Sequence, residues 1–169
     1  MKLTARSQAI YDKIAESIKT NNLTLDSGAW GVTIDATGKT LHVEDAEAGA
    51  VCAVGAGCLW NSAMQHAPGI HPVIAFASLH DVSPLFAFGV SDGFESNTEE
   101  NVEDISWRTL WKRFVHHLND YYEGPASLKQ RRIDSITKLE AHEVGTKKDY
   151  CEGVRLGCAI ASKYLSGAV

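Results

Sequence analysis

The sequence AGAVCAVGAGCLWNSAM, residues 48–64, fits two quite different structures, a phosphate-binding loop or a helix of small residues. A phosphate-binding loop needs a strand, then glycines at fixed spacing, then a helix whose N-terminus faces the phosphates. Here the glycines follow the acidic turn VEDAE, residues 43–47, and no Lys-Ser or Lys-Thr pair comes after them. The sequence therefore predicts a helix over 46–66 that packs closely against another segment.

Small residues gather on one face of this expected helix, at Ala46, Gly49, Ala50, Ala53 and Gly57. Cys52 lies near its start, where a helix dipole lowers the pKa of a thiol, but the acidic residues of 43–47 oppose ionisation. The four cysteines form two apolar pairs without CxxC spacing, which favours reduced, structural thiols over a nucleophile.

The segments before residue 46 predict a helix and a hairpin. Residues 4–20 carry apolar residues at helical spacing, and Thr4 is positioned to cap the first turn. Residues 30–34 and 40–43 are typical of two strands joined by the turn 35–38. We therefore predict a single α+β domain over 1–169, dominated by helices, with a small β-hairpin packed on the small-residue helix.

The segments after residue 68 are less uniform. Residues 69–94 hold short apolar runs broken by Pro and Gly, which fit buried strands or short helices equally well. Ser96-x-x-Glu99 resembles a capping box that opens the next helix. Three further helices are expected: an amphipathic one from Ile105 to about 123, one from Pro125 to about 142, and one over about 148–166.

The first third of the chain resembles a family. Trp30-Gly31, a turn containing Asp35 and Gly38, and the segment Cys52-x-x-Gly55-Ala56 are similar to an uncharacterised family of small proteins of actinobacteria and their phages. The likeness covers roughly residues 5–65. The family usually continues with a Trp-Asn-Asp element, where this chain has Ser91-Asp92-Gly93-Phe94. The resemblance implies a bacterial or phage origin and lends no activity.

Composition excludes several functional classes. The formal net charge of −5 opposes general nucleic-acid binding, which depends on Lys and Arg neutralising phosphates. There is no apolar run near the ~20 residues that a membrane span needs, and the start lacks the features of a signal peptide. We therefore expect a cytoplasmic protein, in the host cytoplasm if phage-encoded, and leave self-association open.

Basic residues concentrate in two neighbouring expected helices. Arg108 and Lys112 lie on the first and Arg131 and Arg132 on the second, and Trp107 or Trp111 flanks the first pair. If the two helices are antiparallel, these residues line a cationic groove that holds an anion through charge-assisted bonds and stacking. The competing interpretation, which we favour for the tryptophans, places them in the core and the charges in solvent. The predicted ligand site consists of Arg108, Trp111, Lys112, Arg131 and Arg132, with no catalytic residue, metal or cofactor expected.

An enzymatic alternative rests on His80-Asp81, which resembles the paired ligands of metal-dependent phosphohydrolases of the HD class. His42, His66 or His71 would be the earlier ligand and Asp120 the later one. His116 and Asp120 are also one turn apart, a spacing that can chelate a metal. We favour a non-enzymatic binding protein of phage or bacterial accessory type that recognises a small anionic ligand, such as a nucleotide, or a host protein.

Overall fold

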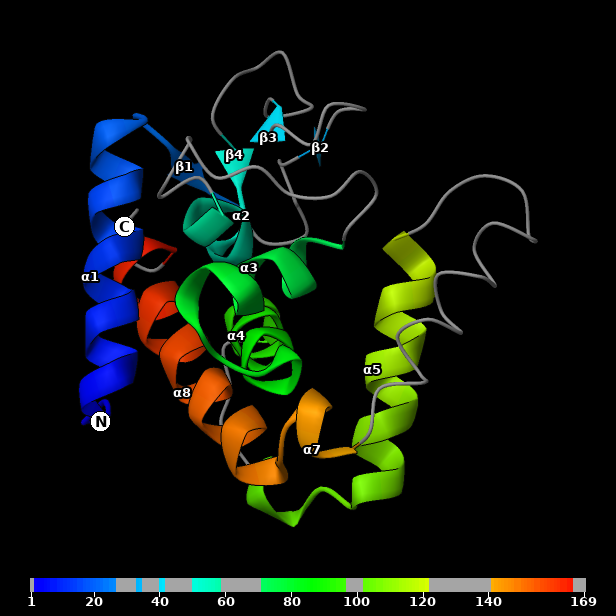
Figure 1. Ribbon diagram of the computed structural model, residues 1–169. Helices are drawn as coiled ribbons and strands as arrows, with labels where there is room; N and C mark the ends of the chain where they lie inside the picture. Colours follow the sequence, from blue (N-terminus) through cyan, green and yellow to red (C-terminus); the bar gives the residue numbers. More distant parts are fainter. Residues whose placement is uncertain are drawn as a thin grey trace.

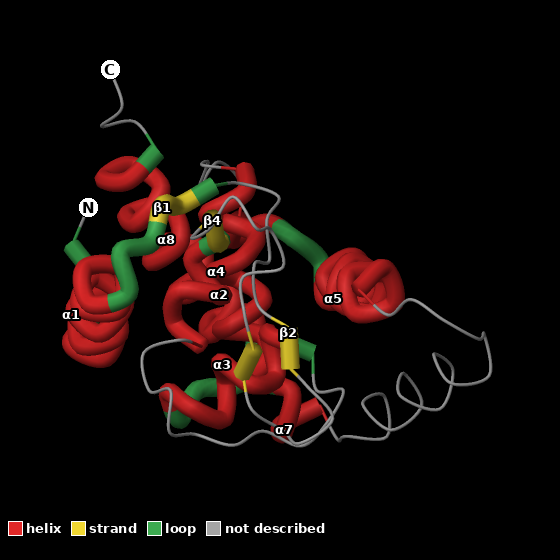
Figure 2. The backbone as a smooth tube through the Cα atoms, turned by 90° about the horizontal axis from the view of Figure 1, so that it is seen from above, coloured by secondary structure: helices red, strands yellow, loops and turns green. Residues whose placement is uncertain are grey.

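The computed structural model describes residues 2–26, 33–34, 40–41, 50–58, 71–96, 102–121 and 141–165. Most of these residues are helical (Figure 2). The α-helices are α1 (Ala5–Thr20), α2 (Ala53–Cys58), α3 (Pro72–His80), α4 (Pro84–Ser96), α5 (Trp107–Tyr121), α7 (Ala141–Val144) and α8 (Lys147–Tyr164), and a 3-10 turn spans Val102–Asp104. The strands are β1 (Thr24–Leu25), β2 (Thr33–Ile34), β3 (Thr40–Leu41) and β4 (Ala50–Val51).

The predicted α+β class is wrong, because the described strands form no β layer. Each is two residues long, and they associate only as pairs, β1 parallel to β4 and β2 antiparallel to β3. Thr24 aligns with Ala50, and Thr33 aligns with Leu41. Strands this short cannot bury a face against a helix. The fold of the described residues is helix-dominated, with its core between helices.

The helix predicted over 46–66 is also wrong at its start. Residues 50–51 are extended and pair with β1, and the amide N–H of Asp26 donates to the Val51 carbonyl at 2.9 Å. Helix α2 begins only at Ala53. Residues 51–58 are buried on every side rather than on a single small-residue face. Residues 59–70 lie outside the described part of the chain.

The helices lie across the molecule in the order α1, α8, α4 and α5 (Figures 1 and 2). Helices α4 and α8 form the centre, and their backbones touch at glycines. A Cβ atom added to Gly89 would lie 2.2 Å from the Tyr150 carbonyl oxygen, and one added to Gly153 would lie 2.0 Å from that of Phe86. Gly93 and Gly157 repeat these contacts one turn further on. Only residues without a side chain allow this approach.

Residues 69–94, which sequence patterns left open, form helices α3 and α4 where they are described. His71 is the N-cap of α3, and Asp81 ends that helix in the left-handed conformation with φ of 52°. Ser83 accepts from the Phe86 N–H at 3.2 Å as α4 begins. Within the described ranges no single helix is long and apolar enough to cross a membrane; α3 and α4 pass that test only as a pair bent by 118°.

The predicted capping box at Ser96 is wrong, because Ser96 is the last residue of α4 and its hydroxyl donates to the Asp92 carbonyl at 2.8 Å. A capping box is found instead at the start of α8. There the Thr146 side chain accepts from the Asp149 N–H at 3.1 Å, and the Asp149 carboxylate accepts from the Thr146 N–H at 3.0 Å. The predicted helix from Pro125 falls outside the described residues apart from α7.

Candidate functional site

The solvent-facing side of α5 carries two aromatic and two cationic side chains in adjacent rows. Trp107 and Trp111 are one turn apart, and their rings stack with centroids 6.1 Å apart and planes inclined at 26°. Arg108 and Lys112, also one turn apart, are exposed beside them. We call Trp107, Arg108, Trp111 and Lys112 the α5 strip.

The opposite side of α5 fixes the orientation of this strip. Leu110, Phe114 and Leu118 are fully buried at helical spacing, so the rows that include Arg108 and Lys112 must face solvent. Ser106 immediately precedes the first residue of the helix, and its hydroxyl accepts from the Thr109 N–H at 3.2 Å. Local amphipathicity and this cap together explain why the four residues share one surface.

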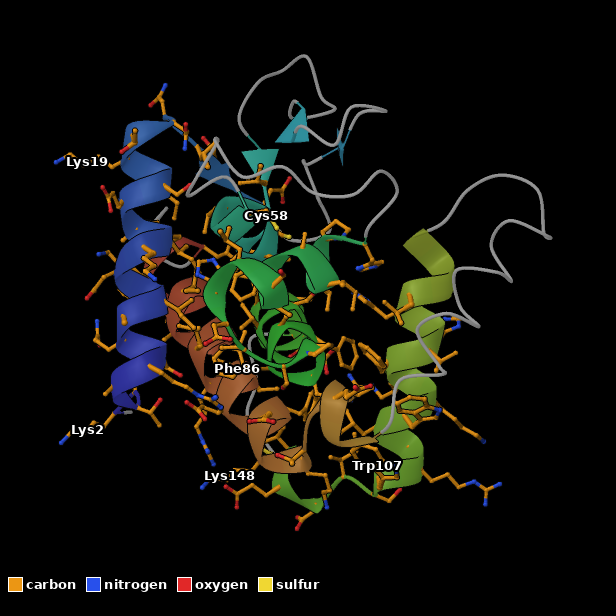
Figure 3. The ribbon with its side chains drawn as sticks, in the orientation of Figure 1. Lys2, Lys19, Cys58, Phe86, Trp107 and Lys148 are labelled. Carbon is orange, nitrogen blue, oxygen red and sulfur yellow. The ribbon has the colours of Figure 1, made fainter. Side chains whose placement is uncertain are left out.

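Trp107 is the exposed large hydrophobic residue of the described chain, with 38% of its surface accessible. Trp111 is half-buried, because its inner edge contacts Phe114 at a centroid distance of 5.9 Å. Figure 3 shows Trp107 at the lower end of α5, away from the central helices. The interpretation that both tryptophans belong to the core is therefore wrong for Trp107. An exposed, pre-stacked indole can stack against a planar ligand.

The two cations of the strip differ from their basic neighbours. Arg113, the next basic residue of α5, pairs with Asp92 and donates to the Tyr150 hydroxyl at 3.3 Å. Arg155 of α8 pairs with Glu103. In the described part of the chain, neither Arg108 nor Lys112 takes part in a hydrogen bond or ion pair. Among the described residues, no acidic side chain neutralises their charge.

The structure brings together three of the five predicted site residues, Arg108, Trp111 and Lys112, on one helix face. Arg131 and Arg132 lie outside the described residues, so the predicted second wall of the groove has no structural counterpart here. Sequence reasoning treated Trp107 as an alternative to Trp111. In the structure, Trp107 is more accessible to solvent than Trp111.

The His80-Asp81 pair has structural roles. His80 is buried, its Nε2 lies 3.1 Å from the Gly57 carbonyl oxygen, and its ring contacts the tilted ring of Phe76 at a centroid distance of 4.4 Å. Burial lowers the pKa of His80 to about 4, which keeps the ring neutral near pH 7. Asp81 ends α3. Within the described ranges, no three His, Cys, Asp or Glu side chains are placed to hold a metal ion.

All four cysteines are buried as thiols rather than disulfides, as their spacing predicted. Burial raises the pKa of Cys52 to about 12, and it raises the pKa values of Cys58 and Cys151 as well. The Cys52 sulfur accepts from the Gly55 N–H at 3.4 Å, which closes the first turn of α2. A thiol protonated at neutral pH is a poor nucleophile, so this position is structural.

Two features were missed at the sequence level. The glycine pairs Gly89-x-x-x-Gly93 and Gly153-x-x-x-Gly157 were visible as spacing and signal close helix packing. The contact between His71 and His117, with ring centroids 5.3 Å apart, joins positions that no local pattern connects.

Comparison of the chain with protein-family models, with curated proteins and with solved structures gave no match. The likeness to the small proteins of actinobacteria and their phages therefore stays a prediction from the sequence.

Proposed function

We propose that this protein is a binding protein that recognises a small anionic ligand with a planar ring, such as a nucleotide, through the α5 strip. One observation carries the proposal: two cations that pair with no other described residue lie beside a stacked tryptophan pair, one of them exposed, on one helix. The net charge of −5 makes such a local cationic surface stand out from the rest of the chain.

The chemistry of the strip fits the two halves of a nucleotide. Arg108 and Lys112 donate charge-assisted hydrogen bonds to phosphate oxygens, and their one-turn spacing lets both reach one phosphate chain. The exposed face of Trp107 stacks with a base. Arg131 and Arg132, from the following segment, would extend the cationic side if they lie near.

The proposal is tested by calorimetric titration with ATP, with inorganic phosphate as the ligand that lacks a ring. We expect Arg108→Ala and Lys112→Ala each to weaken ATP binding by about 10- to 100-fold, since a hydrogen bond to a charged group contributes ~1.5–3 kcal/mol. Trp107→Ala should weaken ATP binding and leave phosphate binding unchanged.

Lys19→Ala is the matched control, because Lys19 lies in the last turn of α1, on the opposite side of the molecule from α5 (Figure 3). It should bind ATP as the unmodified protein does. Equal affinity in all variants, or no binding of any anion, would reject the strip as a ligand site. Recognition of a host protein would then be the better account.

A further inference from the structure

The residues just before α5 are acidic. Glu103 and Asp104 belong to the 3-10 turn that precedes the helix, and both are exposed. Glu103 pairs with Arg155 of α8. Asp104 forms no hydrogen bond or ion pair with another described residue. An acid that no described cation pairs with therefore lies at the end of the α5 strip that begins with Trp107.

Asp104 does not pair with the cations of its own chain. Asp104 and Arg108 are four residues apart, a spacing at which opposite charges pair on a continuous helix. Ile105 and Ser106 belong neither to the 3-10 turn nor to α5, so the helical row stops before it reaches Asp104. Among the described residues, Asp104 forms an ion pair neither with Arg108 nor with Lys112. The start of α5 thus presents one acid and, further along, two cations.

Apolar side chains lie between these charges. Trp107 exposes 38% of its surface, and Ile105 and Trp111 are half-buried. Figure 1 shows the start of α5 at the lower edge of the molecule. Covering an exposed tryptophan removes apolar surface from water, which favours association, and tryptophan is prominent among the residues that contribute most at protein interfaces. Asp104, Ile105 and the α5 strip together form what we call the α5 edge.

The order of the charges determines which protein surface matches the α5 edge. A purely acidic surface matches Arg108 and Lys112 but is repelled by Asp104, and a purely basic surface has the reverse defect. A matching surface carries both signs in the opposite order. A second copy of this chain meets that requirement, because a two-fold axis presents the same patch to itself in the reverse direction.

We propose that two copies of the chain associate through the α5 edge, with their α5 helices antiparallel about a two-fold axis near Arg108. Positions 104 and 112 are equally far from position 108 along the chain, so each Asp104 lies opposite Lys112 of the second copy. The symmetric contact contains this ion pair twice. Each Arg108 reaches the Trp107 ring of the second copy, where a cation–π contact separates the two guanidinium groups.

The contact is small. Stable dimers bury about 1,200–2,000 Å² in total, whereas the α5 edge spans only about two turns of one helix. Exposed ion pairs are weak and are screened by salt. We therefore expect a weak dimer whose population rises with protein concentration and falls with salt. ATP should displace the second copy from Arg108 and Lys112, and this expectation alone rests on the proposed function.

Sedimentation velocity of the full chain, over a range of protein concentrations, tests the dimer without any ligand. Asp104→Lys and Lys112→Glu should each weaken dimerisation by about tenfold or more, because each replaces two attractive pairs with two repulsive ones. The variant with both substitutions should dimerise as the unmodified protein does. Asp12→Lys and Lys19→Glu make the same charge changes at exposed positions of α1, so they are the matched controls and should leave the dimer unchanged.

A mixture of the two single variants tests the two-fold arrangement most directly. In a mixed pair, the two substituted side chains face each other with opposite charges, and so do the native Asp104 and Lys112. The mixture should therefore form dimers, although neither variant does so alone. A protein that stays monomeric at every concentration would overturn the proposal, as would a dimer that the single variants do not weaken. Dimerisation that neither the double variant nor the mixture restores would overturn it too.

Circular dichroism verifies that each variant is folded. If one is not, Trp107→Ala and the salt response of the unmodified protein replace it. Both the loss of the ring and an increase in salt from ~0.05 to ~0.5 M should weaken the dimer. A dimer that responds to neither would refute the proposal. All of these measurements are made without nucleotide, so a failure here leaves the ATP titration unaffected.

Discussion

At the scale of single residues, Glu152 joins the N-terminal helix to α8. Arg6 donates to both of its carboxylate oxygens, at 2.9 and 2.7 Å, and to Asp149 at 2.9 Å. The hydroxyl of Ser7 donates to Glu152 at 3.1 Å, and that of Thr4 donates as well. The Arg6 guanidinium also lies 4.9 Å from the centroid of the Phe86 ring. The hydrogen bonds from Arg6 chiefly lower the pKa of Glu152, to about 2.

This shift predicts a pH-dependent effect of Glu152→Gln. Because the folded pKa lies below the ordinary value of 4.5, the charge stabilises the fold above about pH 4.5, and this contribution is lost as the pH falls toward 2. Thermal unfolding should show a lower Tm for the variant at pH 7, and the difference should shrink below pH 4.5. Glu103→Gln is the control, since the exposed Glu103–Arg155 pair contributes little. A difference in Tm that does not vary with pH would contradict the argument.

At the scale of elements, the close contact of α4 and α8 is the most demanding feature of the fold. Four glycines, two on each helix at a spacing of four, bring each backbone against the carbonyl oxygens of the other. The Cys158 sulfur donates to the Gly93 carbonyl at 3.4 Å in the same contact. No side chain can be added at these positions without moving one helix away from the other.

Gly153→Ala should therefore destabilise the protein, although alanine is the better helix former. The new Cβ would lie 2.0 Å from the Phe86 carbonyl oxygen, and overpacking of this kind costs about 1–3 kcal/mol. Denaturant unfolding measures the change. Ser162→Ala, at an exposed position of the same helix, should be neutral or slightly stabilising. Equal stability of Gly153→Ala and the unmodified protein would mean that the two helices are further apart than described.

At the scale of the whole molecule, one polar cluster connects three helices. Asp92 of α4 accepts from Arg113 of α5 and from the Tyr150 hydroxyl of α8. Burial, then the contact with Asp92, raises the pKa of Tyr150, so its hydroxyl stays protonated and donates. The ring of Tyr150 packs against Phe88, next to the histidine contact. The cluster thus fixes α5 at a second point along its length.

Tyr150→Phe removes the hydroxyl and keeps the ring, so it removes the hydrogen bond to Asp92 together with the one accepted from Arg113. A hydrogen bond to a charged group contributes ~1.5–3 kcal/mol, and the loss should appear as a lower midpoint of denaturant unfolding. Tyr164→Phe, at the half-buried end of α8, is the control and should change the midpoint little. Faster hydrogen exchange confined to α5 would show that the cluster holds that helix in particular. An unchanged midpoint together with unchanged exchange would contradict this role.

Local patterns in the sequence were sufficient for three helices. Thr4 caps α1 as predicted, accepting from the Ser7 N–H at 3.2 Å. The amphipathic pattern predicted the ends of α5 and α8 to within a few residues, and it predicted that Arg108 and Lys112 face solvent. In each of these helices one face is apolar and the other polar, so apolar residues recur along the sequence with the helical period of 3.6 residues. The positions of Arg108, Trp111 and Lys112 on one helix were predictable for the same reason.

The tertiary structure decided what this periodicity cannot encode. Helices α3 and α4 are almost wholly buried and apolar on all sides, so no alternation distinguished them from strands. Residues 50–51 are extended because β1, 26 positions earlier, supplies their hydrogen-bond partners, although the alanines of this segment favour a helix. The meeting of His71 with His117 likewise depends on where α5 docks. Contacts between distant segments override the local secondary-structure preference here, because buried polar groups of the backbone and of side-chain rings need contacts with whichever segment packs against them.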